Sequence, residues 1–186
     1  MLTVLWGALW VPRGGFSEGV PLELTRLTAR TAVFFFLAAF SASALLTLTR
    51  SPAARFLMIN RRHIGLAFAL AHFIHLGVLV AYFAVSGEDP GRVRIIGGGL
   101  AYLLIALMAA TSNNAAQRWL GPNWRRLHLV GSWYVWLVFF NSYLGRVLEA
   151  REPIWLYGGI TALLLGAAAL RIAMSVRRLL RSTAVR

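Results

Sequence analysis

The sequence contains no cysteine, no lysine and only six acidic residues among its 186 positions. Without cysteine the chain cannot form a disulfide, a thiolate metal site or a cysteine nucleophile, and its cysteine usage indicates no redox compartment. The acids lie outside the long apolar runs, so no run supplies a carboxylate for a tetrahedral zinc site or a proton relay. They are Glu18, Glu23, Glu88, Asp89, Glu149 and Glu152.

Long apolar runs dominate the remainder, and 59% of all residues are hydrophobic. A soluble domain of this size cannot bury so much apolar surface in one core. Runs of about twenty residues cross a hydrocarbon layer of about 30 Å, and they occur near 31–49, 63–85, 95–112, 128–146 and 154–174. We therefore predict an all-α fold, a polytopic membrane helix bundle with about five transmembrane helices. The intervals between the runs are rich in charge or helix breakers and are predicted to be loops.

The net charge of +13 comes from arginines in short bursts between the apolar runs. This pattern indicates topology rather than a nucleic-acid surface, and no nucleic-acid partner is expected. One set of alternate loops, with the C-terminal tail, carries twelve arginines and no acid. By the positive-inside rule this side is cytoplasmic, which predicts the N-terminus outside and the C-terminus inside. The same rim could bind anionic lipid, a flavin phosphate such as that of FMN, or an acidic donor protein, although topology and headgroup contact alone explain it.

Three segments are predicted along the chain. Residues 1–24 include MLTVLWGALWVP, which is too short for a span and is expected to be interfacial or the remnant of a truncated helix. Residues 25–175 form the transmembrane domain, and residues 176–186 a basic cytoplasmic tail. In the last run Gly158, Ala162 and Gly166 recur every four residues, which predicts close packing by a neighbouring helix.

Histidines stand where lipid makes polarity costly. His72 and His75 lie deep in the second run, where ionisable residues usually face the bundle interior and mark pathways or cofactors. They are about 60° apart around a helix, so one could ligate while the other hydrogen-bonds a neighbour. His63 and His128 lie at the membrane edge, where a solvated imidazole is the default for His63 and ligation by His128 is an open question.

The second and fourth runs are predicted to be parallel, so depth can be compared along them. His75 lies about 18 Å beyond His63, and Asn141 lies about 20 Å beyond His128, which places Asn141 level with His75. A parallel pair of helices offering neutral imidazoles can hold a haem between them. Haem therefore leads among the hypotheses that give these histidines a function.

Three passages resemble, in order and spacing, the ferric-reductase-like transmembrane domain family. They are TARTAVFFFLAAF, RRHIGLAFALAHFIH and TSNNAAQRWLGPNWRRLH. The most specific parts are RR-x-x-G-L with a histidine thirteen residues after the second arginine, and TS-x-N-A…LG-x-x-W-x-x-LH. The likeness covers about residues 25–175 and is greatest to the haem-binding membrane subunits of bacterial periplasmic methionine sulfoxide reductase systems.

The resemblance implies a b-type haem protein of the bacterial inner membrane, itself an electron-transfer subunit of an oxidoreductase system. Electrons would come from quinol or a cytoplasmic flavin reductase and leave to a periplasmic redox partner protein. The family pattern makes His75 and His128 haem-iron ligands. Arg61 stands at the inner position where related oxidases carry a further histidine, whereas His63 and His72 match no family ligand.

The sequence departs from the family pattern at Asn141, where a second histidine is expected on the fourth span. Asparagine is a weak iron ligand, and His128 is too far along its helix to replace it. Three outcomes stay open: a five-coordinate haem on His75, a haem that uses His72 or a shifted register, or a fold that holds no haem. The number of haems is also open. A haem-free scaffold or assembly protein is the main alternative function, and a small transporter lined by His72 and His75 is a third.

Overall fold

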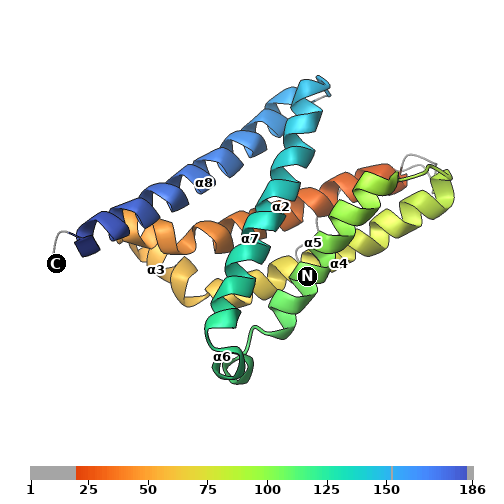
Figure 1. Ribbon diagram of the computed structural model, residues 1–186. Coiled ribbons are helices and arrows are strands. Elements are labelled where there is room, and N and C mark those ends of the chain that lie inside the picture. Colours follow the sequence, from red (N-terminus) through yellow and green to blue (C-terminus); the bar gives the residue numbers. More distant parts are fainter. Residues whose placement is uncertain (1–19, 152, 184–186) are drawn as a thin grey trace.

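The computed structural model describes residues 20–151 and 153–183. These residues form seven helices and no strand (Figure 1). The helices are α2 (Val20–Thr49), α3 (Pro52–Ile59), α4 (Arg61–Ser86), α5 (Arg92–Ala110), α6 (Asn114–Leu120), α7 (Pro122–Leu148) and α8 (Ile154–Thr183). The all-α prediction is confirmed for the described residues. Most of the predicted interfacial segment 1–24, together with Glu152 and the last three residues of the tail, lies outside them.

Four described helices are long and apolar enough to cross a membrane. They cover Leu22–Thr49, Arg61–Ser86, Arg92–Ala110 and Ile154–Arg177, and they coincide with four of the five predicted spans. The fifth prediction, 128–146, falls on α7. This helix of 27 residues is long enough, but polar side chains inside the run, among them His128, Ser132 and Asn141, lower its apolar content. The structure therefore gives four candidate spans and one long helix of mixed composition.

Two of the predicted loops contain short helices, which corrects the sequence-based assignment. In each, a polar side chain caps the first turn. The Ser51 side chain accepts a hydrogen bond from the backbone N–H of Ala54, and Pro52 occupies the first turn of α3, where its missing N–H is not needed. The Asn113 side chain accepts from the N–H of Ala116 and starts α6. These capping signals outweigh the breakers that suggested loops.

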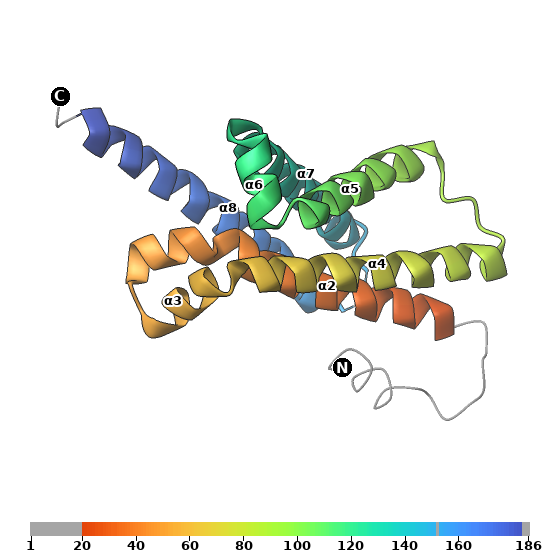
Figure 2. The same cartoon turned by 90° about the horizontal axis from the view of Figure 1, so that it is seen from below.

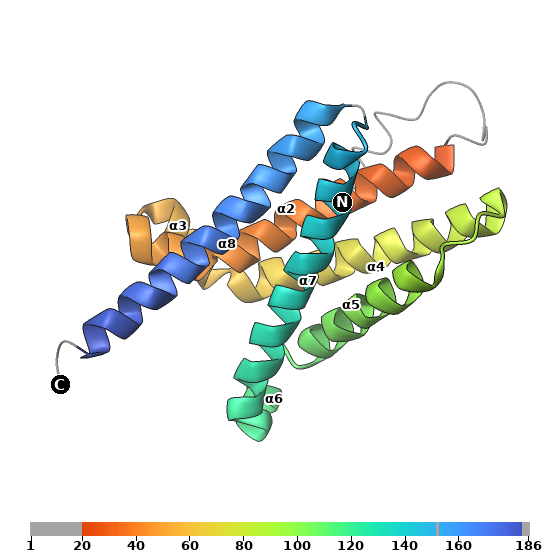
Figure 3. The same ribbon diagram turned by 45° about the horizontal axis from the view of Figure 1, so that its top comes forward.

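Helix α2 lies between α4 and α8 and packs most extensively along α4. Helix α7 packs against α8 and α5 and crosses α2 obliquely (Figures 1 and 3). The short α3 joins α2 to α4 on the side of the molecule where α8 also ends, whereas α6 lies nearer the centre of this view (Figure 2). The α4–α5 and α7–α8 connections lie at the opposite end, which we call the α7–α8 end.

Aromatic side chains fill the region where α2, α4 and α7 meet. The ring of Phe36 lies 5.1 Å from Phe40 in the same helix, 5.4 Å from Phe68 in α4 and 5.3 Å from Phe139 in α7, measured between centroids. All four rings are almost fully buried. Phe36 is therefore the point at which the three helices contact one another.

Large apolar side chains also cover the outer faces of the helices. Leu70 in α4 is 65% exposed, Ile96 in α5 is 70% exposed and Leu163 in α8 is 54% exposed. Exposed apolar surface of this extent is unusual for a soluble monomer, whereas hydrocarbon solvates it without cost. The distribution agrees with helices that face lipid.

Candidate functional site

His72 is buried in α4 among aromatic rings. Its imidazole stacks on Tyr102 of α5 with centroids 4.7 Å apart, and it lies 5.4 Å from Phe68 and 5.4 Å from the edge-on ring of Phe139. Only 8% of the residue is exposed, and Nδ1 has no hydrogen-bond partner among the described residues. A buried ring nitrogen without a partner costs free energy, so His72 joins helices α4, α5 and α7 by ring contacts and keeps one polar atom available.

His75 lies almost one turn further along α4 and contacts α2. Its Nδ1 atom is 2.9 Å from the Thr28 hydroxyl oxygen. That hydroxyl is also 2.8 Å from the Leu24 backbone carbonyl, to which it donates its single proton. From these distances we assign the Thr28 oxygen as the acceptor of the His75 contact, which puts the ring proton on Nδ1 and the free lone pair on Nε2. A fixed tautomer of this kind is the usual arrangement of a metal-ligating histidine.

The centroids of the two imidazoles are 5.5 Å apart. His75 makes the hydrogen bond to a neighbouring helix, and His72 packs among rings. Which of the two binds a ligand stays a prediction. One histidine can make a hydrogen bond and bind a metal at the same time, because a different ring nitrogen serves each role.

His128 lies at the other end of the molecule, near α6. Its Nε2 atom is 3.2 Å from the Thr111 hydroxyl, and its ring stacks on Trp124 with centroids 4.1 Å apart. The Trp124 indole N–H in turn donates to the Thr111 carbonyl at 2.9 Å. These contacts fix the connection from α5 through α6 to α7. The structure does not bring His128 and His75 together, and His128 as an iron ligand stays a prediction of the resemblance.

The other predicted site residues are separated from His75. His63 is exposed near the start of α4. Arg61 donates from Nε to the Ala39 carbonyl at 3.0 Å and so joins α4 to α2. Asn141 lies in α7 and is exposed, and its level with His75 stays a prediction. Positions two residues apart are separated by about 200° around a helix. Asn141 therefore faces away from the buried Phe139, which is the α7 residue that contacts His72.

A haem fits part of this arrangement. The oriented His75 ring suits one axial ligand, and the partnerless Nδ1 of buried His72 is a polar atom that a bound group could satisfy. The α7 residue that faces His72 is Phe139, which has no atom that could ligate iron. Among the described residues, no three His, Cys, Asp or Glu side chains gather into a metal site. The residues therefore fit a haem held by one histidine better than a pair of ligands on α4 and α7.

Four residues near the α7–α8 end form a site that the sequence did not predict. We call Arg30, Tyr143, Arg146 and Tyr157 the arginine–tyrosine cluster. Arg30 of α2 donates to the Tyr157 hydroxyl of α8 at 3.4 Å, and Arg146 of α7 lies 5.7 Å from the centre of the same ring. Arg146 is also close enough to His75 to interact with it electrostatically. The available signal was the position of Arg30 beside an apolar run with no acid three or four residues away, whereas Arg146 has Glu149 three residues further along the chain.

A second arginine contact lies toward the α3 end. The Arg171 guanidinium of α8 covers the ring of Phe40 at 4.1 Å and donates to the Ser132 hydroxyl of α7 at 3.4 Å. Cation–π contacts of this kind are attractive and strengthen when water is excluded. Arg171 therefore joins α8 to α2 and α7.

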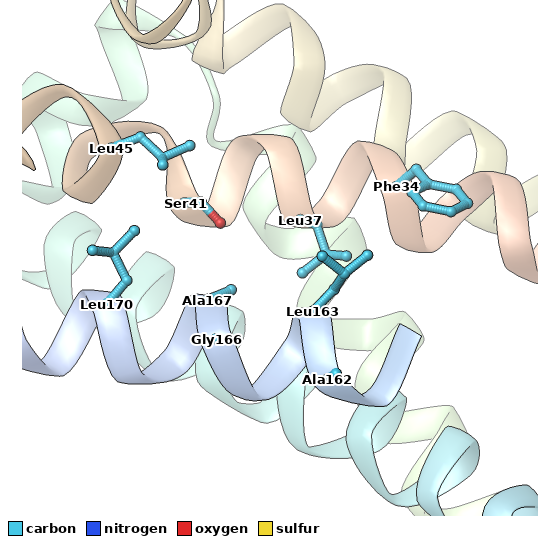
Figure 4. A pocket seen from close by; sticks show the side chains of 9 residues that line it. All are labelled: Phe34, Leu37, Ser41, Leu45, Ala162, Leu163, Gly166, Ala167 and Leu170. Atoms are coloured by element: carbon cyan, nitrogen blue, oxygen red, sulfur yellow. The ribbon is translucent and has the colours of Figure 1, made fainter. Parts of the chain in front are cut away.

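An open groove of about 400 Å³ runs between α2 and α8 (Figure 4). The lining is apolar except for Ser41; its members are Phe34, Leu37, Ser41, Leu45, Ala162, Leu163, Gly166, Ala167 and Leu170. A Cβ atom added to Gly158 or Gly166 would meet nothing within 4 Å. The predicted close packing along this small-residue stripe is therefore wrong within the chain, because Ala162 and Gly166 line the open groove.

No protein-family model and no solved structure matches the chain. The assignment of function therefore depends on the residues and contacts described above.

Proposed function

We propose that the protein is a b-type haem electron-transfer subunit of a membrane oxidoreductase system, with His75 as the axial ligand. One observation supports this most directly: an imidazole inside an apolar helix of 26 residues contacts the Thr28 hydroxyl through Nδ1, and the tautomer assigned from that contact leaves Nε2 for a metal. Ionisable residues at such positions usually serve a cofactor or a pathway. The partnerless His72 nitrogen beside it adds a second polar atom in the same region.

The residues around His75 have separate roles in this proposal. Thr28 fixes the ring, and Arg146 supplies a nearby positive charge, which favours the reduced over the oxidised form of a bound iron centre. When bound, the haem supplies a one-electron couple whose potential depends on its axial ligand and surroundings. Phe139, which faces His72 from α7, has no ligating atom, so His75 would hold the haem without a partner ligand at that position.

The partners follow from the resemblance to the ferric-reductase-like family. We propose the bacterial inner membrane as the location, with five spans, the N-terminus outside and the C-terminus inside. α7 is then the fifth span, and its arginines lie near its ends. Quinol or a cytoplasmic flavin reductase, with FMN, donates electrons, and a periplasmic redox protein accepts them.

Electron transfer can be tested with purified protein loaded with haem and placed in liposomes. Reduction of the haem is followed by absorbance after addition of a soluble quinol, or of NADH with a flavin reductase and FMN. The proposal predicts reduction by at least one donor and reoxidation when an external acceptor is added. A haem-loaded protein that neither donor reduces would refute the electron-transfer function while leaving haem binding intact.

A haem-free scaffold or assembly protein is the second candidate function. The specific observation in its favour is the aromatic packing of Phe68, Tyr102 and Phe139 around His72, which fills the space between α4 and α7. The two candidates differ in thermal unfolding with and without haemin, because a ligand that binds the folded state raises its stability. A raised midpoint supports the haem protein, and an unchanged midpoint in folded protein supports the scaffold.

A further inference from the structure

The arginine–tyrosine cluster brings two positive charges to a single ring. The guanidinium carbons of Arg30 and Arg146 each lie 5.7 Å from the centre of Tyr157, so they are at most twice that distance apart. Arg146 also lies 6.0 Å from the centre of the Tyr143 ring, and the two tyrosine rings are 6.2 Å apart. Three helices, α2, α7 and α8, supply these four residues. Such a convergence of like charges is unfavourable unless an anion joins it.

Two polar atoms of the cluster have no partner. The Nε atom of Arg30 and the hydroxyl of Tyr143 are buried without a hydrogen bond to any described residue. Tyr143 as a whole is only 4% exposed. Both atoms are donors, and buried donors without acceptors are rare in folded proteins. The cluster therefore lacks an acceptor that carries more than one oxygen or a negative charge.

The described carboxylates are occupied elsewhere. Glu23 pairs with Arg26, and Glu149 pairs with Arg151. Asp89 accepts from the Gly91 backbone N–H, and Glu88 interacts with Tyr82. None of these four acids forms an ion pair with Arg30 or Arg146, so a carboxylate partner for the two arginines lies outside the described residues.

We infer that the arginine–tyrosine cluster binds a carboxylate group of a membrane-soluble ligand. The planar forks of two guanidiniums match carboxylate oxygens, and the phenol of Tyr143 supplies a further donor. The aromatic rings and the apolar helices around the cluster suit the hydrophobic body of an amphiphile rather than a hydrated ion. The carboxylate has two sources: a propionate of a haem on His75, in which case the inference rests on the proposed function, or a free fatty acid.

Metal-free protoporphyrin IX is the probe for the first source, since it carries two propionates but no iron. Its binding to the detergent-purified full chain is measured by fluorescence titration, beside its dimethyl ester, in which both carboxylates are blocked. We expect the wild type to bind the free acid more tightly than the ester. Loss of one charge-assisted contact in Arg30→Gln or Arg146→Gln should weaken binding of the acid roughly tenfold to a hundredfold and leave the ester unchanged.

Two further variants control for folding. Arg151→Gln removes an arginine near the same end that already has a carboxylate partner, and it should bind the acid like the wild type. Tyr143→Phe removes a hydroxyl that has no partner without ligand, so the unliganded protein should keep or raise its melting temperature while binding of the acid weakens. A purely structural role for Tyr143 would instead lower the melting temperature.

The outcomes also separate this inference from the haem proposal. Binding of oleate is measured with a fluorescent analogue. If oleate binding depends on Arg30 and Arg146 while protoporphyrin does not bind, the result supports a free fatty acid as the source of the carboxylate. His75→Ala should abolish the iron-dependent spectrum of a haem but retain binding of metal-free protoporphyrin. The inference is overturned if the wild type and both arginine variants bind the free acid equally tightly. It is also overturned if the wild type binds neither protoporphyrin IX nor oleate. Both results hold whatever the haem spectrum shows.

Discussion

Replacing Thr28 by valine removes the hydrogen bond that orients His75 while keeping the shape of the side chain. The Thr28 hydroxyl oxygen lies 2.9 Å from His75 Nδ1 and donates its proton to the Leu24 carbonyl at 2.8 Å. In Thr28→Val the imidazole N–H has no side-chain acceptor on α2, and the ring can turn or change tautomer. Nε2 is then no longer fixed as the free lone pair.

The magnitude follows from the measured strength of such bonds in membranes. Hydrogen bonds between transmembrane helices contribute about 0.6 kcal/mol on average and about 1.7 kcal/mol at most. These values correspond to a haem affinity that is roughly 3-fold to 20-fold weaker. The helix itself should lose little, because the second bond of Thr28 is to a carbonyl of its own helix.

Thr31→Val is the matched control on α2. Its hydroxyl donates to the Leu27 carbonyl at 3.0 Å, as Thr28 does to Leu24, but it contacts no histidine. Haemin titrations of both variants, followed at the Soret band, therefore isolate the contact with His75. Equal affinities for Thr28→Val, Thr31→Val and the wild type would refute the assigned role of Thr28 and the tautomer inferred from it.

Three further predictions concern packing and His128. A Cβ atom on Gly131 would lie 2.8 Å from the Met108 sulfur. Because that flexible side chain can move, Gly131→Ala should change the melting temperature little, whereas the larger side chain of Gly131→Leu should cost about 1–3 kcal/mol of stability. Equal melting temperatures of the two variants would contradict this. Trp136 donates to the Leu164 carbonyl at 2.9 Å between α7 and α8, so Trp136→Phe should cost about 1 kcal/mol in unfolding by denaturant, and an unchanged midpoint would argue against the contact. His128→Ala should lower thermal stability yet retain the haem spectrum, and a lost Soret band in folded protein would show that His128 is a ligand.

The sequence was sufficient for the long helices because their apolar runs are continuous over bilayer length. It was insufficient for α3 and α6, where single capping residues, Ser51 and Asn113, start helices inside segments rich in breakers. The run at 128–146 was predicted to be a span, but the polar residues of α7 give it a mixed composition, and it is not among the four candidate spans. Short helices and mixed helices depend on local and tertiary contacts that hydropathy does not contain.

The candidate site, like the fold, was predicted from the sequence only in part. Burial of His72 and an interhelical contact for His75 follow from their depth in an apolar run, and both are observed. Helix rise predicts only a depth for Asn141, whereas its direction depends on the rotation of α7, which turns Phe139 inward instead. The arginine–tyrosine cluster could not be predicted, because it exists only where α2, α7 and α8 meet.

The most direct test of the central claim is the absorption spectrum of the detergent-purified protein, oxidised and reduced with dithionite, beside His75→Ala. Haem is supplied during expression, and circular dichroism confirms that both proteins are helical. The account predicts a Soret band that shifts on reduction in the wild type and is lost in His75→Ala. A spectrum without visible bands from folded wild type, or bands that persist in His75→Ala, would contradict it.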